Sequence, residues 1–395
     1  MAYVSLYTAL IAVGIGQTIV FAVLAPLGRD LGLAEVQVGA IISASSLVFF
    51  LASPIWGRVS DRWGRKPVML VGLVGYTLGT LLFASLFSVG YAGLLAGIPL
   101  WLALIVARML QSSVMSATPP ASSAWMADMT TPAERTAGMG RIGAANNVGA
   151  VVGPALGGTL AAAFGLLMPL WFAAGITLVA AAGIAWWLPR VGSGRSQTGT
   201  PPRLRITDSR ILPFMLVGFF MFMGFAVVQQ TIAFRMQDVL ELTGQETARM
   251  VGMSMMFSAA MSLLAQGVVV QRMNVTPLPL LRAGVIILIA AFLLLAAARQ
   301  PSLFVIAMGV MGFGMGLAAP GFTAGGSLAV TADEQGSVAG LTASVPALGF
   351  TVGPLLGTAL YQWLPGAPYL LTAALFVPLM LYTWRIRLKR SPTEL

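Results

Sequence analysis

The ten residues GRVSDRWGRK, at positions 57–66, carry five charged side chains, whereas only 9% of the whole chain is charged. They separate two apolar runs, 36–57 and 67–89. Each run has roughly the 20 residues that a helix needs to cross the hydrocarbon core of a bilayer. A charged stretch between two such runs indicates a short loop at a membrane surface, and we call residues 57–66 the hinge.

The composition supports this interpretation over all 395 residues, of which 58% are hydrophobic. Soluble domains are about 45–50% apolar and about 25% charged. The chain is therefore an integral membrane protein. It contains no Cys and no His, which excludes a disulfide framework, a Cys/His zinc site and a Cys or His nucleophile. The first apolar run is too long for a signal peptide and is expected to stay as a span.

Apolar runs of spanning length predict twelve helices, many of them with internal Gly or Pro, which membrane helices tolerate. The runs are 5–27, 36–57, 67–89, 95–127, 136–163, 167–188, 211–234, 247–270, 278–298, 302–328, 335–361 and 366–384. One long polar segment, 190–210, is rich in Gly, Ser, Thr, Pro and Arg and is typical of a linker. We therefore expect an all-α membrane protein with twelve transmembrane helices in two six-helix bundles, 1–189 and 211–395.

Basic residues follow the predicted loops unevenly. With both termini in the cytoplasm, the inner loops and the tail hold 17 Arg and Lys residues, the outer loops hold 4, and Arg108 lies inside a span. This positive-inside bias predicts a multi-pass protein of the inner (cytoplasmic) membrane with cytoplasmic termini. The net charge of +10 is then a topology feature of a lipid-embedded protein, and we expect no nucleic-acid partner.

The two halves repeat each other. Four glycines and a proline of the fifth span recur 200 residues later in the eleventh. They are Gly140, Gly149, Gly153, Pro154 and Gly157, repeated as Gly340, Gly349, Gly353, Pro354 and Gly357. The hinge has a degenerate copy, GVVVQRMNVTP, in which Gln271 replaces Asp61. Two six-span halves in parallel orientation are one arrangement of secondary transporters, which predicts pseudo-symmetry.

Three motifs resemble those of the major facilitator superfamily. The hinge fits G-x-x-x-D-R-x-G-R-K at every fixed position. RMLQS, from Arg108, is similar to R-x-x-Q-G, with Ser112 in place of the glycine. Residues 140–158 fit G-x8-G-x3-G-P-x2-G-G, which that family associates with drug/proton antiporters. The resemblance covers nearly the whole chain and implies a transporter with the family's fold, without a cofactor.

The resemblance implies that the hinge latches the cytoplasmic side when the transporter faces outward. Asp61 would then face the start of the eleventh span near Asp333, and a hinge arginine would meet the carboxylate that ends the fourth span. The predicted latch residues are Gly57, Asp61, Arg62, Gly64, Arg65, Lys66 and Asp128. Alternatively, the basic residues only anchor a loop, but an anchor does not require the Asp61 carboxylate.

Arg108 and Gln111 lie one helical turn apart on the same face of the fourth span. An intramembrane arginine is costly and usually faces a cavity or a partner, although Arg108 could instead snorkel from a helix end. We expect the pair to bind substrate anions or to relay protons. The candidate substrate or proton site is Gln17, Phe21, Arg108, Gln111, Gln229 and Gln230. The candidate antiporter motif, a packing face, is Gly140, Gly149, Gly153, Pro154, Gly157 and Gly158.

The leading hypothesis is proton-coupled efflux of drugs or amphipathic organic molecules by a monomer. One alternative is a dedicated exporter of a metabolite such as a siderophore. Another is uptake of an organic solute or a soft metal, because the 22 methionines offer thioethers, although we expect no bound metal. Every acidic residue falls at a helix end, loop or tail, so coupling would use Asp61, Asp128, Asp238 or the substrate itself. An enzyme is disfavoured, since no span contains a carboxylate pair.

Overall fold

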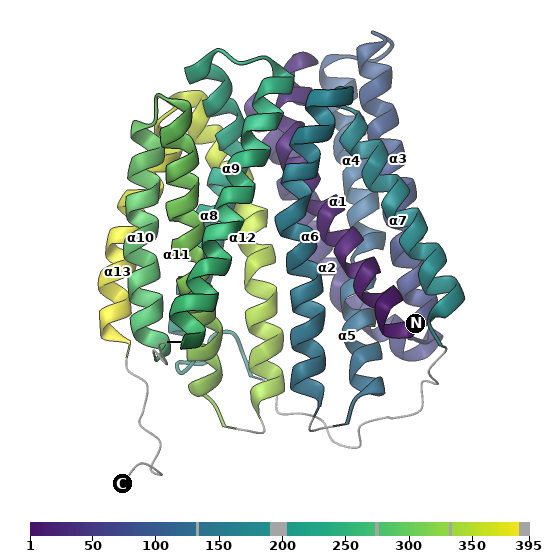
Figure 1. Cartoon of the computed structure of the whole chain (residues 1–395), viewed down its shortest axis with the longest axis vertical. Helices are drawn as coiled ribbons and strands as arrows, with labels where there is room; N and C mark the ends of the chain where they lie inside the picture. Colours follow the sequence, from purple (N-terminus) through teal and green to yellow (C-terminus); the bar gives the residue numbers. More distant parts are fainter. Residues whose placement is uncertain (132–133, 190–203, 273–275, 332–333, 387–395) are drawn as a thin grey trace. The chain divides into compact units, whose positions relative to one another are not determined.

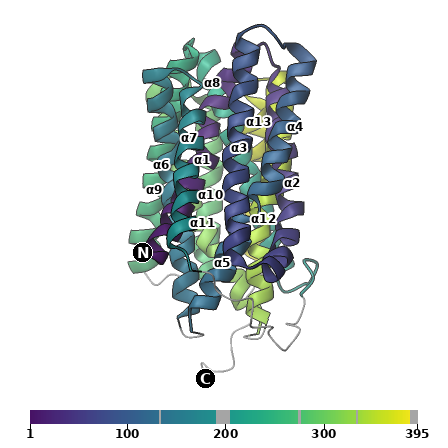
Figure 2. The same ribbon diagram turned by 90° about the vertical axis from the view of Figure 1, so that its right-hand side faces the viewer.

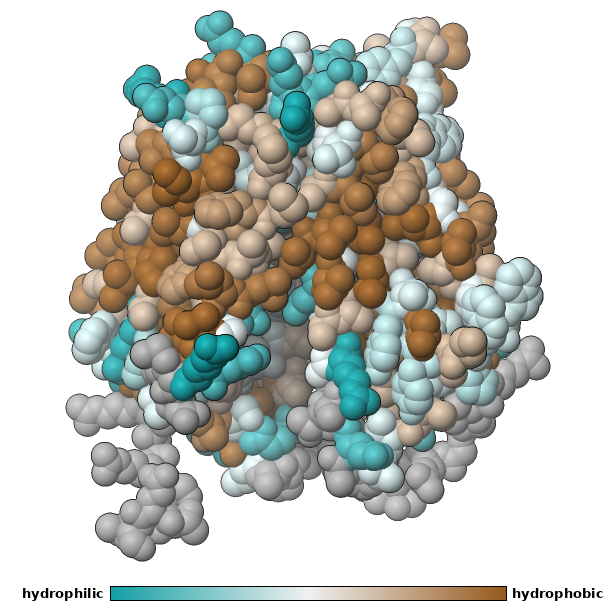
Figure 3. Space-filling model, viewed as in Figure 1, coloured by the Kyte–Doolittle hydropathy of each residue, from teal (hydrophilic) through white to brown (hydrophobic). Residues whose placement is uncertain are grey.

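A computed structural model describes residues 1–131, 134–189, 204–272, 276–331 and 334–386. The described residues form helices and no strand, and twelve of the helical segments are long and apolar enough to span a membrane. This confirms the predicted fold class. The space-filling view shows apolar side chains over the middle of the helices and hydrophilic ones toward the helix ends (Figure 3), as expected for a surface that contacts lipid.

The helices of the first half are shown in purple to teal in Figure 1. They are α1 (Ala2–Asp30), α2 (Glu35–Trp63), α3 (Arg65–Tyr91), α4 (Gly97–Met115), α5 (Thr118–Met129), α6 (Arg135–Phe164) and α7 (Met168–Trp187). The predicted span at 95–127 is divided into α4 and α5. The division falls at Ser116 and Ala117, directly before a Thr-Pro-Pro sequence. Pro119 and Pro120 have no N–H group to bond the carbonyls of the preceding turn, so α4 ends there and the two prolines lie in the first turn of α5.

The second half follows the same pattern of spans. Its elements are α8 (Leu212–Leu240), α9 (Gly244–Leu264), the π-helical segment η1 (Ala265–Val270), α10 (Pro277–Ala297), α11 (Pro301–Leu328), α12 (Gln335–Trp363) and α13 (Ala367–Arg385). The helices α5, α7, α10, α11 and α13 carry proline in their first turn. Proline suits this position, because the first backbone N–H groups of a helix have no intrahelical acceptor.

The chain divides by its contacts into two compact units. The described part of unit 1 is 1–189 with 232–256, and that of unit 2 is 204–231 with 257–386, apart from the gaps given above. The C-terminal end of α8 and the first part of α9 thus belong to unit 1. Most of the predicted linker at 190–210 lies outside the described residues, so the predicted domain boundaries stay a prediction.

Within unit 1, α1 packs against α6 and α7, and α3 packs against α4 and α7 (Figure 2). Within unit 2, α10 packs against α11 and α13. We call the end of unit 1 that contains Asp30, Tyr91 and Leu240 the outer end, following the predicted topology. The opposite end of unit 1, which contains the hinge, is the inner end.

Candidate functional site

Arg108 lies in α4 with only 6% of its surface exposed, so it does not snorkel to the membrane surface. Its guanidinium donates a hydrogen bond to Gln111 Oε1. The Gln111 amide in turn donates to Thr80 Oγ1 at 2.6 Å and to the Tyr76 carbonyl at 3.4 Å, both on α3. Arg108, Gln111, Thr80 and Tyr76 form what we call the Arg108 cluster. It joins α3 and α4 through one chain of hydrogen bonds.

Among the described residues, no carboxylate balances the charge of Arg108. In the described residues no Asp or Glu oxygen lies within 4.0 Å of its guanidinium. The guanidinium carbon is 5.6 Å from the centroid of the Phe83 ring, a contact that offsets part of the desolvation of the cation. Arg108 Nε has no hydrogen-bond partner. The cluster therefore has an unused donor and an uncompensated positive charge.

Tyr76 adds a second unused group, because its buried hydroxyl has no partner in the described chain. The ring packs on Gly16 of α1, where a Cβ would lie 2.9 Å from Tyr76 Cζ. Gln17 and Phe21 follow on α1 and are half-buried. Buried donors without partners are rare in folded proteins, and a ligand is one of the few explanations for them. The cluster can accept a hydrogen-bonding or anionic group.

The structure brings Arg108 and Gln111 together, while Gln229 and Gln230 belong to unit 2. The Oε1 atoms of both glutamines are buried and lack a hydrogen-bond partner. Thr80 and Tyr76 were not among the residues predicted from the sequence. Their spacing of four residues in a long apolar run places them on one helix face, and this spacing is the observation that could have identified them.

The hinge contains a three-residue ion network at the inner end. Arg65, the first residue of α3, donates from Nε to Asp128 Oδ2 at 3.0 Å and also bonds the Asp61 carboxylate. Gly64 has φ +92°, a backbone conformation that glycine adopts without strain. Lys66 Nζ bonds the Ala185 carbonyl at the end of α7. These contacts join α2, α3, α5 and α7.

The remaining latch residues make fewer contacts. Arg62 is exposed, and a Cβ at Gly57 would meet Pro120 at an ordinary 3.7 Å. Asp333, which we expected opposite Asp61, lies outside the described residues. The latching role of the hinge stays a prediction.

The glycines of the antiporter motif bring α6 against α1. A Cβ at Gly149 would overlap the Ile11 carbonyl, a Cβ at Gly153 would lie 2.7 Å from the Ile15 carbonyl, and one at Gly157 would lie 2.8 Å from Ile19. Such contacts require backbones to approach without side chains between them.

The repeated glycines do the same in unit 2. Gly349, Gly353 and Gly357 of α12 pack against α8, and a Cβ at any of the three would lie within about 3.1 Å of it. Gly140 and its counterpart Gly340 both have open space around them. The repeat therefore marks equivalent helix pairs, α1 with α6 and α8 with α12, in line with the expected pseudo-symmetry.

The other side of α6 packs against α9 at the outer end. A Cβ at Gly158 would lie 2.6 Å from the Ala248 carbonyl, and a Cβ at Gly252 would lie 2.5 Å from the Pro154 carbonyl. The motif thus presents two smooth faces. One contacts α1 and the other contacts the first part of α9.

An arginine network that the sequence analysis did not anticipate also lies at the outer end. Arg29 of α1 donates to Glu35 Oε1 at 2.8 Å, to Asp238 Oδ2 at 3.0 Å and to Gln237 Oε1 at 3.4 Å. Its guanidinium carbon lies 4.8 Å from the centroid of the Phe234 ring. One side chain thereby ties the end of α8 to α1 and α2.

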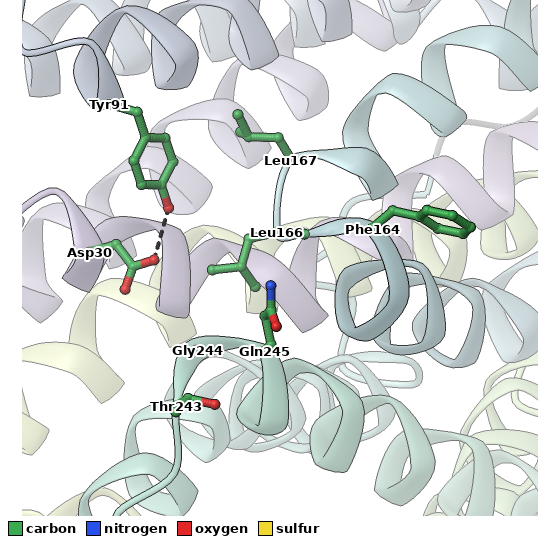
Figure 4. A pocket seen from close by; sticks show the side chains of 9 residues that line it. Asp30, Tyr91, Phe164, Leu166, Leu167, Thr243, Gly244 and Gln245 are labelled. Atoms are coloured by element: carbon green, nitrogen blue, oxygen red, sulfur yellow. Dashed lines mark hydrogen bonds between the residues drawn. The ribbon is translucent and has the colours of Figure 1, made fainter.

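A pocket of about 430 Å³ opens beside this network. It is lined by Asp30, Tyr91, Phe164, Gly165, Leu166, Leu167, Thr243, Gly244 and Gln245. The Tyr91 hydroxyl donates to Asp30 Oδ2 at 2.9 Å (Figure 4). The lining combines one carboxylate with three apolar side chains and small polar groups. It contains no Arg or Lys.

The repeat extends to two Thr–Glu contacts, one in each unit, in the turns before α6 and α12. Glu134 and Glu334 each accept a hydrogen bond at 2.9 Å from the threonine three residues earlier, Thr131 and Thr331. Glu334 also receives two bonds of 2.8 Å from Arg210. These arginine bonds, with smaller contributions from Thr331, lower the pKa of Glu334 from 4.5 to about 2.

Comparison with known proteins gives consistent matches. The family model of the Major Facilitator Superfamily matches residues 6–350. Solute carrier family 22 member 18 of Rattus norvegicus is 29% identical over 367 residues, which cover 87% of this chain and 83% of the rat protein. Multidrug resistance protein 2 of Bacillus subtilis is 26% identical over 340 residues, covering 82% of this chain and 80% of its own.

Two solved structures share the fold. The human organic anion transporter MFSD10 has a TM-score of 0.68 at 20% identity, covering 97% of this chain and 98% of its own. A bacterial homologue of the human lysosomal transporter Spinster has a TM-score of 0.77 at 15% identity, covering 99% and 98%. At such identities the likeness shows the fold alone.

Proposed function

The chain belongs to the Major Facilitator Superfamily, and from that premise we propose that it is a secondary transporter that exports amphipathic organic molecules in exchange for protons. The observation that carries this proposal is the Arg108 cluster. Its unused Arg108 Nε and Tyr76 hydroxyl suit a polar or anionic substrate group, and the apolar interior around them suits the rest of an amphipathic molecule. A sugar would require many more hydrogen-bonding side chains.

The export direction rests on the antiporter motif. The faces that its glycines present to α1 and α9 allow α6 to slide without interlocking side chains. The similarity to multidrug resistance protein 2 of Bacillus subtilis, 26% identical to this chain, supports drug-like compounds as the substrate class.

Proton coupling rests on the carboxylates of two ion networks. Asp61 and Asp128 share Arg65 at the inner end, and Asp238 shares Arg29 at the outer end. Protonation of a paired carboxylate weakens its ion pair, so proton binding would bias the conformation that the pair stabilises. In the alternative coupling scheme, the substrate carries the titrating group.

Flux into liposomes tests the proposed function. The purified chain is reconstituted, and uptake of a fluorescent amphipathic anion is followed with and without an imposed pH gradient. We expect the gradient to drive accumulation and a protonophore to abolish it. Equal flux with and without the gradient would refute proton coupling. If only one compound of a broad panel is transported, the chain is a dedicated exporter. If the substrate moves in the same direction as the proton, the chain is an uptake symporter.

A further inference from the structure

The pocket beside the Arg29 network, which we call the outer pocket, has a negatively charged lining group, whereas the Arg108 cluster is positively charged. Its charged lining group is a carboxylate, Asp30, which uses one oxygen to accept the Tyr91 hydrogen bond. A carboxylate has about four lone-pair sites, so Asp30 can accept further hydrogen bonds. Figure 4 shows Asp30 and Tyr91 on one side of the pocket, with Thr243 and Gln245 across from them. The pocket therefore offers hydrogen-bond acceptors around a negative charge.

The charge of the surrounding surface strengthens this field. The outer end of unit 1 carries five carboxylates against three guanidinium groups, a local charge of −2 in a chain of +10. These residues are Asp30, Glu35, Asp238, Glu241 and Glu246, with Arg29, Arg235 and Arg249. Such a local excess attracts cations to the pocket mouth.

The lining also has an apolar part. Leu166 and Leu167 supply apolar lining, whereas Phe164 is 70% exposed and its ring points away from Asp30 (Figure 4). The volume of about 430 Å³ falls in the range of small-molecule sites, which combine mainly apolar walls with a few polar anchors. The pocket thus suits a ligand with one cationic group and a small apolar body.

We propose that the outer pocket is a binding site for a primary or secondary alkylammonium with a short apolar body. The ammonium group donates to Asp30 and is accessible to the oxygen atoms of Thr243 and Gln245. The apolar body lies against Leu166 and Leu167. This site differs from the Arg108 cluster in charge and in place, and its existence does not depend on the proposed transport function.

A ligand bound in this pocket would also slow transport, and this second inference does rest on the proposed function. The pocket walls come from the ends of α1 and α3, the α6–α7 connection and the start of α9. Arg29 holds the end of α8 beside them. A ligand that bridges Asp30 and Gln245 would stabilise these contacts, so an amine added from outside would slow any cycle in which α9 separates from α6.

Binding is tested on the purified full-length protein in detergent by isothermal titration calorimetry. The probe is 2-phenylethylammonium chloride, and its neutral counterpart 2-phenylethanol has a similar size. We expect the ammonium to bind about tenfold or more tightly than the alcohol, because the alcohol has no charge to pair with the Asp30 carboxylate. Asp30→Asn should weaken ammonium binding by about the same factor. The matched control Glu241→Gln, an outer acid that does not line the pocket, should change it less than about twofold.

Equal affinity for the ammonium and the alcohol, or equal effects of Asp30→Asn and Glu241→Gln, would overturn the proposal. If Asp30→Asn does not fold, Gln245→Arg replaces it. This change adds a competing cation on an exposed side chain and should abolish binding. Arg108→Gln should leave amine binding intact, and loss of binding in that variant would place the amine at the Arg108 cluster instead.

A transport measurement tests the expected slowing of the cycle by the bound amine, which we call the clamp, separately from binding. Externally added 2-phenylethylammonium should slow substrate flux by the wild type and not by Asp30→Asn. Binding without slowing would refute the clamp while the binding site stands. A chain that binds the amine through Asp30 but moves no substrate under any gradient would refute the proposed transport function and not the site.

Discussion

At the scale of single residues, Arg108 has a charge that is costly to place inside a membrane, and its Nε donor has no hydrogen-bond partner. A charged side chain at the centre of a membrane helix costs about 2.5–3.5 kcal/mol on insertion scales. Gln111 and the Phe83 ring offset part of this cost, but no carboxylate in the described chain does. A residue that served only stability could be replaced by an apolar one at a gain. We infer that Arg108 is present for binding.

Arg108→Gln should therefore lower the transport rate of an anionic amphipath about tenfold or more, while the protein unfolds at the same or a higher temperature. Arg108→Lys should be intermediate, because lysine keeps the charge but loses the planar fork of donors. Initial rates in proteoliposomes and thermal unfolding are the measurements. Arg299→Gln, an exposed arginine between α10 and α11, is the matched control. Unchanged substrate affinity and rate in Arg108→Gln would contradict the binding role.

Glu334 gives a pH-dependent prediction at the same scale. Its pKa is lowered from 4.5 to about 2 in the folded chain, chiefly by the hydrogen bonds from Arg210. A carboxyl group with a lowered folded pKa stabilises the fold fully above its unfolded pKa, and this contribution is lost as the pH falls toward the folded pKa. The unfolding temperature of the wild type should thus exceed that of Glu334→Gln above about pH 5, and the difference should vanish between pH 4.5 and 2.

The partner of Glu334 provides the control. In an Arg210→Gln background the effect of Glu334→Gln on the unfolding temperature should shrink, because the coupled pair is already broken. An effect that is independent of pH, or one unaffected by Arg210→Gln, would contradict the assignment.

At the scale of elements, two repeated glycines of α6, Gly149 and Gly140, differ in the space around them. A Cβ at Gly149 would overlap the Ile11 carbonyl and lie 2.8 Å from Ile15 N, whereas nothing lies within 4 Å of one at Gly140. Gly149→Ala should thus force α1 and α6 apart and destabilise the protein by about 1–3 kcal/mol. Gly140→Ala should be neutral or stabilising by about 0.5–1 kcal/mol, since alanine favours helix.

Thermal or denaturant unfolding of both variants measures this contrast, and proteoliposome flux reports whether Gly149→Ala also impairs transport. The same pair of substitutions can be repeated at Gly349 and Gly340, where the surroundings are equivalent. If Gly149→Ala were as stable as Gly140→Ala, close packing would not explain why the glycines recur.

At the scale of the whole molecule, properties set by local sequence were predictable and long-range pairings were not. Apolar run length predicted the twelve spans, but it did not show that α2 continues to Trp63, through seven of the ten hinge residues, because a helix can extend beyond the apolar core of the bilayer. The exact spacing of Gly149 and Gly349 predicted equivalent packing faces. The Arg29–Asp238 pair joins residues 209 positions apart, and neither residue belongs to a motif.

The hinge shows the same limit within the candidate site. The motif identified Asp61, Arg65 and Asp128 as a set, while the structure shows that one guanidinium bonds both carboxylates. The Asp128 side chain is largely enclosed with Arg65, whereas 63% of the Asp61 side chain is exposed. Asp61 is thus the more accessible of the two carboxylates to another partner, and Arg65 keeps Asp128 when Asp61 leaves.

That difference makes Asp61→Asn the decisive variant for the whole transport cycle. Because Arg65 keeps Asp128, and exposed ion pairs contribute about 0–1 kcal/mol, the variant should express and unfold almost like the wild type. If Asp61 biases two conformations of similar energy, its loss should still lower the transport rate about tenfold or more. Arg58→Gln, an exposed hinge charge, is the matched control and should transport normally. Wild-type flux by Asp61→Asn would reduce the hinge to a loop anchor, whereas lost flux with unchanged stability would place Asp61 in the conformational cycle.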